Sequence, residues 1–402
     1  MQTDLFRDAL RKGLGRAYLI LEREDPAPYR EVLLDACLHD TRIDRQAEHP
    51  RGAWLFELLR LARMEHEALE VLLTTLPTEE DDADRNQMTD LLGAYAVAGS
   101  LRAETALFAR AAGGDARAQD RLAALLPRGL EWLEAQVLPT LDEADAWIVG
   151  RWLRETTEPD THDVQHRLRR FLEAAQAREK ARPKRSRPAS VQEFLRALRK
   201  DTKPQTSPRF FAQEATEAQF QEASERFLTV TSDPALWALR VMFRARPCPL
   251  PLERVFAQAR DEQRGGRVCQ VLGAMNDPRI REFGLSLIAE RPPVKNALDT
   301  LCRSVQPGDE VAIAAVLPAM READDLQKHR VALALFAMAS DTPGFSGQPF
   351  AEWIYEHSPC AFCRNSAVRW MVEHGHLPEA IREEARHDAE PETRTEVVRE
   401  ER

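Results

Sequence analysis

Apolar residues recur along almost the whole chain at steps of three and four residues, which is the period of an amphipathic helix. The first such stripe joins Leu5, Leu10, Leu14, Tyr18 and Leu21. A strand would instead require alternating apolar and polar positions, and the nearest approach to that pattern is the short segment LTVTSD. The pattern therefore predicts an all-α protein with almost no strand.

The helical pattern is interrupted by short polar, Gly-containing or Pro-containing segments. Examples are residues 24–28, 76–84, 112–116 and 248–251. The predicted helices between such breaks are short, at about 10–20 residues. Many short helices with brief turns are typical of stacked antiparallel helix pairs, and that arrangement often produces an internal repeat.

Four predicted helix starts in the second half of the chain share a small or acidic residue followed by Pro. Such a pair places an N-cap residue directly before a Pro at the first helical position. The second and fourth starts then carry an arginine three residues after the Pro, Arg281 and Arg394. Their spacing fits a repeat of roughly 40 residues, if the longest interval spans two units. The four segments are SDPALW (232–237), NDPRIR (276–281), SPCAFCR (358–364) and AEPETR (389–394).

The D-P-x-x-R starts, each followed by an amphipathic helix, resemble HEAT-like repeats of the armadillo-type superhelix, most strongly over residues 230–402. The chain is also similar in texture to stand-alone bacterial HEAT-repeat proteins without an assigned activity. This resemblance implies an α-solenoid of antiparallel helical hairpins. Stacked hairpins bury a continuous core and leave an extended concave surface that suits a binding partner.

A basic, Pro-rich segment separates the two halves. Residues 178–209 hold eleven basic and three acidic side chains together with four prolines. We therefore predict an N-terminal helical array over residues 1–177, a basic linker over 178–209 and a HEAT-like array over 210–402. Within the linker, residues 191–200 are expected to form a short amphipathic helix.

Composition narrows the functional classes. The net charge of −10 argues against a surface built throughout for phosphate backbones, although a local basic patch remains compatible with it. Six scattered cysteines do not form a disulfide framework and favour a reducing compartment. The N-terminus has no signal-peptide pattern, and the longest apolar runs are too short to cross a bilayer. We expect a cytoplasmic protein that does not contact a membrane.

The segment EHSPCAFCRNSAVRWMVEHGH holds the only close cysteine pair, Cys360 and Cys363. With His357 these thiols are candidate zinc ligands, whereas His374 lies about 16 Å from Cys363 along a continuous helix. A redox pair is the second interpretation, because a helix N-terminus and the nearby Arg364 lower a thiol pKa. The third interpretation, which we favour, is that both cysteines are small core residues.

A second polar cluster occupies residues 37–54. Its potential donors to a divalent metal or to acid–base catalysis are His39, Asp40, Asp44, Glu48 and His49. The spacing matches no known catalytic motif, so we favour a polar loop that joins two helices.

The basic linker offers a nucleic-acid alternative. Its candidate phosphate contacts are supported by Phe194, Phe210 and Phe211 as stacking platforms. Some HEAT-like proteins are DNA glycosylases with a basic concave face and Trp residues, which Trp132, Trp147, Trp152 and Trp353 could imitate. The candidate basic contacts are Lys180, Arg182, Lys184, Arg185, Arg187, Arg199, Lys200 and Lys203.

No phosphate-binding Gly-rich loop, nucleophile elbow or HExxH helix occurs in the sequence. We therefore expect a non-catalytic scaffold or adaptor that binds a partner protein or peptide on its concave surface, without a cofactor. Nucleic-acid binding and a thiol sensor at Cys360 and Cys363 remain alternatives. The sequence indicates neither the partner nor the oligomeric state.

Overall fold

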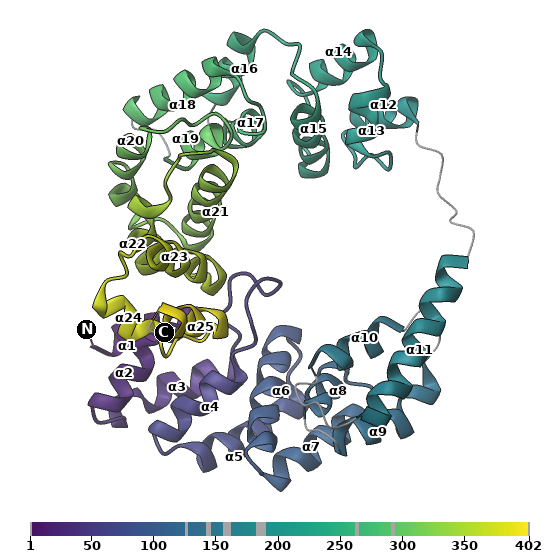
Figure 1. Ribbon diagram of the computed structural model, residues 1–402, viewed down its shortest axis with the longest axis vertical. Helices are drawn as coiled ribbons and strands as arrows, with labels where there is room; N and C mark the ends of the chain where they lie inside the picture. The colour runs from purple at the N-terminus through teal and green to yellow at the C-terminus, as the bar shows by residue number, and fades with distance from the viewer. Residues whose placement is uncertain are drawn as a thin grey trace. The chain divides into compact units, whose positions relative to one another are not determined.

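The computed structural model describes residues 2–124, 128–141, 146–155, 162–181, 190–261, 265–290 and 294–400 (Figure 1). Throughout these residues the regular elements are α-helices and short 3₁₀-helices, with no strand. The predicted all-α class is confirmed. None of the helices in this part of the chain has both the length and the apolar character that a bilayer crossing requires.

Contacts divide the chain into two compact units. The first consists of Met1–Lys184 together with Leu377–Arg402, and the second is Arg185–His376. This division differs from the predicted boundaries at both ends of the second array. The last segment of the chain groups with the N-terminal unit, and the described part of the linker from residue 190 onward belongs to the second unit.

In its described residues, unit 1 begins with eleven α-helices and ends with two more that come from the C-terminal segment of the chain. Their bounds are α1 Gln2–Lys12, α2 Arg16–Arg23, α3 Arg30–Leu38, α4 Gly52–Leu61, α5 Glu65–Thr75, α6 Asp82–Val97, α7 Leu101–Ala112, α8 Ala116–Ala123, α9 Arg128–Gln136, α10 Ala146–Glu155, α11 His162–Ala181, α24 Glu379–Ala385 and α25 Pro391–Glu400. Short 3₁₀-helices lie at Ala27–Tyr29, Leu76–Thr78 and Leu138–Thr140.

Within unit 1, alternate helices pack side by side. The helix α4 contacts α6, α6 contacts α8, and α8 contacts α10, while α7 packs against both α6 and α8. Local sequence sets the starts of three of these helices, because the side chains of Asp81, Ser100 and Asp115 accept hydrogen bonds from backbone N–H groups of the first turn. The result is a regular succession of helix pairs.

An ion pair recurs between these alternate helices. Asp90 of α6 pairs with Arg121 of α8 at 3.4 Å, and Asp120 of α8 pairs with Arg151 of α10 at 2.5 Å. In both pairs the arginine follows the aspartate by the same number of residues, and both aspartates are almost fully buried. This spacing supports a repeated unit in the N-terminal half, where the sequence showed helical pairs but no shared motif.

The C-terminal segment completes the core of unit 1. The backbone N–H of Ala389 donates to the carbonyl of Gly13 at 2.9 Å, and the indole of Trp54 donates to the carbonyl of His387 at the same distance. The ring of His387 also stacks on Tyr18 with centroids 3.9 Å apart. In Figure 1 the yellow helices α24 and α25 accordingly lie beside the purple helix α1.

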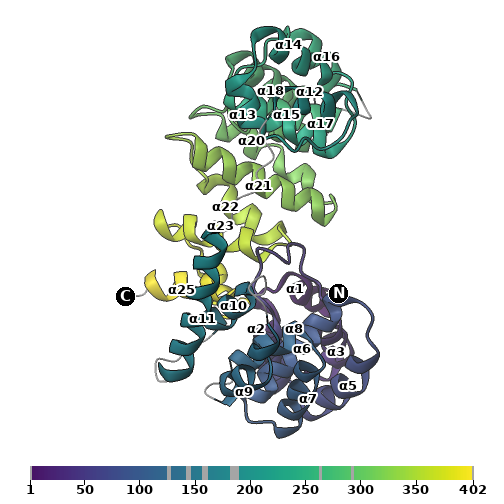
Figure 2. The same ribbon diagram turned by 90° about the vertical axis from the view of Figure 1, so that its right-hand side faces the viewer.

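Unit 2 contains twelve α-helices in its described residues. Their bounds are α12 Val191–Arg199, α13 Pro208–Glu214, α14 Glu217–Arg226, α15 Asp233–Ala245, α16 Leu252–Ala259, α17 Gly265–Leu272, α18 Pro278–Glu290, α19 Val294–Leu301, α20 Glu310–Ala314, α21 Asp325–Asp341, α22 Gln348–His357 and α23 Ala361–Glu373, with a 3₁₀-helix at Leu317–Met320. The helices α12 to α17 lie together in both views (Figure 1, Figure 2).

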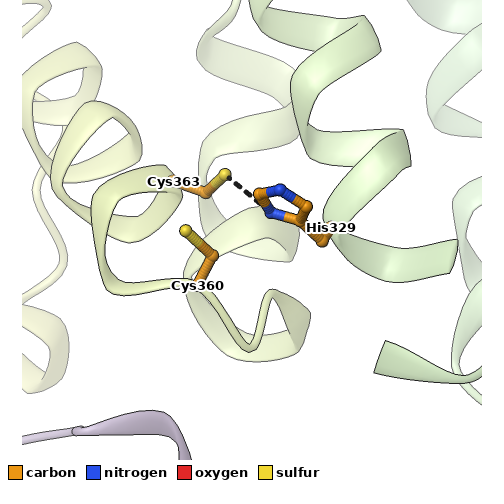
Figure 3. Close-up of side chains that lie close together, drawn as sticks. All are labelled: His329, Cys360 and Cys363. Atoms are coloured by element: carbon orange, nitrogen blue, oxygen red, sulfur yellow. Dashed lines mark hydrogen bonds between the residues drawn. The ribbon is translucent and has the colours of Figure 1, made fainter. Parts of the chain in front are cut away.

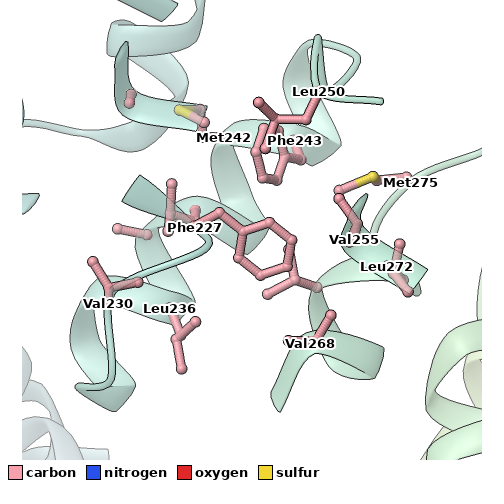
Figure 4. Packing of buried hydrophobic residues seen from close by; sticks show 14 of the residues in the cluster. Phe227, Val230, Leu236, Met242, Phe243, Leu250, Val255, Val268, Leu272 and Met275 are labelled. Atoms are coloured by element: carbon pink, nitrogen blue, oxygen red, sulfur yellow. The ribbon is translucent and has the colours of Figure 1, made fainter. Parts of the chain in front are cut away.

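Alternate packing recurs in unit 2, where α13, α15, α17, α19, α21 and α23 contact one another in succession. The apolar faces of the helices from α12 to α19 meet in a cluster that includes Phe227, Met242 and Leu272, each at most 1% exposed (Figure 4). The helix α12 enters the same cluster through Phe194, whose ring stacks on Phe211 at 4.2 Å. Residues 191–200 therefore form the expected amphipathic helix, and its apolar face is part of the core.

The predicted helix starts are found in the structure. The helix α15 begins at Asp233 after the N-cap Ser232, and α18 and α25 begin at Pro278 and Pro391. The helix α23 begins one residue later than expected, because Cys360 is its N-cap.

Arginines near these starts fix the adjoining loops. Arg281 of α18 forms two hydrogen bonds with Asp309, the N-cap of α20, at 2.6 and 2.8 Å. Arg364 and Arg394 instead donate to backbone carbonyls just before their own helices. The motif arginine therefore has different partners in different helices, although each partner lies at a helix start.

Asp201 fastens the turn after α12 to the start of α15. Its carboxylate accepts hydrogen bonds from the backbone N–H groups of Thr231 and Ser232, at 2.9 and 3.0 Å, and from the Thr231 hydroxyl at 2.7 Å. Partial burial raises the pKa of Asp201, but these hydrogen bonds outweigh it and lower the pKa to about 2. The ionised carboxylate therefore stabilises unit 2 at neutral pH.

We expect Asp201→Asn to destabilise unit 2 by about 1 kcal/mol at pH 7, after allowance for solvent screening. Because the pKa is lower in the folded state, the stabilisation is complete above the ordinary pKa of about 4 and disappears as the pH falls towards 2. Asn tolerates the left-handed φ of 53° at this position, so the backbone is unaffected. Urea unfolding at pH 7 and pH 3 measures the difference, with Glu214→Gln as an exposed control. An equal difference at both pH values would contradict the assignment.

Candidate functional site

The two close cysteines lie at the junction of α22 and α23. Cys360 has the extended backbone of an N-cap residue, with φ −87° and ψ 122°, and Cys363 lies in the first turn of α23. The N–H of Cys360 donates to the hydroxyl of Ser358 at 3.3 Å. Both cysteines are 0% exposed, so the loop directs both thiols into unit 2.

A third side chain, His329 of α21, reaches the same place (Figure 3). Its Nδ1 lies 3.5 Å from Sγ of Cys363, and the donor atoms of His329, Cys360 and Cys363 all lie within 4.8 Å of one another. His329 is 8% exposed. Among the described residues, His329, Cys360 and Cys363 are the one group of three or more potential metal ligands whose donor atoms lie close together.

His329 is not among the residues predicted from the sequence, because it lies on a different helix, far from the cysteines in the chain. Its segment KHRVALALF has the ordinary pattern of an amphipathic helix and no ligand spacing. The only local signal was a histidine that falls among the buried positions of α21.

Hydrogen bonding and burial shift the pKa of the Cys363 thiol. The neighbouring Cys360 thiol and burial both raise the pKa of Cys363 well above its usual value, although the nearby charge of Arg364 opposes this rise. The redox interpretation relies on a lowered pKa at this helix start, whereas the pKa of Cys363 is raised. The reason is that the thiol lies inside the protein, where a thiolate is poorly solvated. An exposed, reactive dithiol does not fit this environment.

The other histidines of the segment lie elsewhere. His357 is the last residue of α22, and its ring lies against Trp353 with centroids 5.3 Å apart. His374 is the C-cap of α23 and His376 follows it, and both are exposed. The predicted separation of His374 from the cysteines by the length of a helix is thus confirmed, and His329 takes the position beside the thiols.

The polar cluster at residues 37–54 is used to build a loop. Arg42 binds both carboxylate oxygens of Asp40, at 2.9 and 2.8 Å. Glu48 accepts the backbone N–H groups of Ile43 and Asp44, both at 3.0 Å, and it also binds the buried Arg51. These carboxylates have structural partners, which agrees with the interpretation as a polar loop.

The candidate nucleic-acid contacts of the basic linker fall into two groups. The side chains of Lys180, Arg182, Lys184, Arg185 and Arg187 lie outside the described residues. Of the three remaining candidates, Arg199 pairs with Glu222 at 2.5 Å, and Lys200 and Lys203 are exposed.

Several of the aromatic residues predicted to stack on bases are buried. Phe194 and Phe211 are 0% exposed, so they are not stacking platforms for bases. Trp152 is likewise buried, whereas Trp147 is 57% exposed and has the guanidinium of Arg151 over its ring at 5.0 Å. Phe194, Phe211 and Trp152 are therefore core residues rather than stacking platforms.

A groove of about 480 Å³ lies in unit 1, on the side of α4, α6 and α8, with Pro391 of α25 at its edge. Its wall includes Ala53, Phe56, Val97 and Ala98. Val97 is 65% exposed there. The helices α4 and α6 pack closely beside the groove, because a Cβ on Gly52 would lie 2.4 Å from the backbone of Asp90.

Charged side chains lie at the base of this groove. Asp90 is held by two hydrogen bonds of 2.6 Å from Arg117, and Arg121 lies on its other side. The groove thus combines an apolar wall with a fixed, compensated polar group, a combination typical of ligand pockets.

Comparison of the chain with protein-family models, with curated proteins and with solved structures finds no match.

Proposed function

We propose that this chain is a HEAT-like α-solenoid scaffold that binds a segment of a partner protein and catalyses no reaction. The groove on α4, α6 and α8 is the observation that carries the proposal. Support for a solenoid comes from the alternate packing of helices within each unit and from the recurring Asp–Arg pairs of α6, α8 and α10. In such proteins the face formed by alternate helices is the usual binding surface.

The groove suits an apolar side chain of an extended or helical segment. Phe56 and Val97 offer apolar contact, and small residues such as Ala53 and Ala94 leave room between them. The charges of Asp90, Arg117 and Arg121 are already paired, so they fix the orientation of a polar group without a large desolvation cost. The backbone of the partner segment can therefore lie across the charged base of the groove, while an apolar side chain of that segment contacts the apolar wall.

A matched pair of substitutions tests the proposal. Val97→Arg places a charge in the groove, whereas Leu101→Arg changes an equally exposed apolar residue (72%) on the next helix, outside the groove. We expect a partner recovered with the wild-type chain and with Leu101→Arg to be lost with Val97→Arg. Titration of the purified partner should then show at least a tenfold weaker affinity for Val97→Arg, because a buried unpaired charge costs more than 1.4 kcal/mol.

Three results would contradict the proposal. If both variants bind the partner equally, the groove is not the docking site. If no protein binds the wild-type chain specifically, the scaffold function fails. If the wild-type chain turns over a substrate, the statement that it catalyses no reaction fails.

A further inference from the structure

We infer that His329, Cys360 and Cys363 bind a thiophilic metal ion, Zn(II) or Cu(I), inside unit 2. The three donors come from two separate helices and from the loop between α22 and α23, yet their ligand atoms lie within 4.8 Å of one another (Figure 3). Such convergence of two thiols and an imidazole is the donor set that soft metals prefer. This inference goes beyond the scaffold function and does not depend on it.

The distances suit coordination. With Zn–S bonds of about 2.3 Å and Zn–N bonds of about 2.0–2.1 Å, neighbouring donors of a tetrahedral site lie roughly 3.4–3.8 Å apart. Nδ1 of His329 and Sγ of Cys363 are 3.5 Å apart, within that range. The other donor separations are at most 4.8 Å, and a shift of up to about 1 Å, which a change in the side-chain torsion of one cysteine supplies, brings them into the same range.

The surrounding charge also suits a metal. Both thiols are fully buried, and a bound cation stabilises the thiolate form of a cysteine ligand in such a place. On binding, each cysteine releases its proton to solvent and donates a sulfur lone pair to the ion. Two thiolates balance Zn(II), while with Cu(I) they leave one negative charge that the fully buried Arg364 offsets. Three protein donors satisfy Cu(I), whereas Zn(II) would take a fourth donor such as water.

The site has a direct structural consequence. His329 belongs to α21 and Cys363 to α23, and these two helices already pack against each other. An ion held by both helices links them through strong bonds at the C-terminal end of unit 2. Because the unfolded chain lacks the assembled site, metal binding stabilises the folded unit.

The experiment uses the full chain, stripped of metal and kept reduced. Co(II) is the probe for the Zn(II) arm, because thiolate–cobalt bonds give an intense charge-transfer absorption. We expect this absorption to saturate at one ion per chain, to vanish when Zn(II) is added, and to accompany a rise of several degrees in the thermal midpoint. The Cu(I) arm is competition with a coloured Cu(I) chelator. The ion for which the chain has the higher affinity is assigned to the site.

Variants locate the binding. His329→Gln, Cys360→Ser and Cys363→Ser should each weaken binding at least tenfold, while Cys302→Ser, a buried cysteine of the same unit, should leave it unchanged. Circular dichroism shows whether each variant is folded. If a variant is unfolded, the titration of the wild-type chain still shows whether the metal ion binds. If neither Co(II) nor Cu(I) binds the wild-type chain at a saturating concentration, the proposal is overturned, and the three side chains form only a hydrogen-bonded core contact. Binding that none of the three substitutions in the site weakens would also overturn it.

Discussion

Arg51→Met is expected to destabilise unit 1 by about 3–5 kcal/mol, because it removes one member of a buried ion pair. The guanidinium of Arg51 is almost fully buried and binds Glu48 at 2.9 Å. It also donates to the carbonyls of Leu10, Arg11 and Lys12 at 2.8–3.2 Å, and so ties the loop before α4 to the end of α1. Met fills similar space but leaves the Glu48 carboxylate without a cation and these carbonyls without their donor.

Chemical denaturation followed by circular dichroism measures this effect. Arg45→Met is the control, because Arg45 is 54% exposed and its pairing with Asp40 at 3.3 Å is worth less than about 1 kcal/mol. Adding Glu48→Gln to Arg51→Met should restore part of the loss, since the uncompensated charge disappears. A stability of Arg51→Met within 1 kcal/mol of wild type would show that the buried pair does not hold this loop.

Gly15→Ala is expected to cost on the order of 3 kcal/mol, although it adds a single methyl group. Gly15 has an ordinary φ of −59°, so alanine introduces no backbone strain. The new Cβ would lie 1.8 Å from the carbonyl oxygen of Glu384 and 2.8 Å from the carbonyl carbon of His387. These are backbone atoms of the C-terminal segment, and they can move away only if α24 separates from α2.

The matched control is Gly150→Ala in α10. A Cβ at Gly150 would have its nearest neighbours at 3.7 Å, which is ordinary contact, and alanine is preferred over glycine in a helix by about 1 kcal/mol. The same chemical change should therefore be neutral or stabilising there. Hydrogen exchange adds a local readout, because Gly15→Ala should raise exchange in α1, α2 and α24. Equal effects of the two substitutions would mean that the C-terminal segment is not packed tightly on α2.

Part of the candidate site could be predicted from sequence. The Cys-x-x-Cys pair and its place at a helix start follow from local chain geometry, since Ser358 and Pro359 set the backbone before α23. The exclusion of His374 also follows, because the rise of a helix is fixed. The participation of His329 does not, because it depends on how α21 packs against α23. The raised pKa of Cys363 was not predicted for the same reason, since the hydrogen bond with the Cys360 thiol and the burial of Cys363 both depend on how the unit packs.

Local sequence patterns are enough to predict the helices of this protein. Periodic apolar residues, N-cap side chains and Pro at first turns act within a few residues, so the all-α class and the starts of α15, α18 and α25 could be derived without a structure. Tertiary structure alone decided which helices meet. It placed Leu377–Arg402 with the N-terminal unit, buried Phe194 and brought His329 to the cysteines. Such contacts join distant parts of the chain through the fit of side chains in three dimensions, and local sequence does not encode that fit.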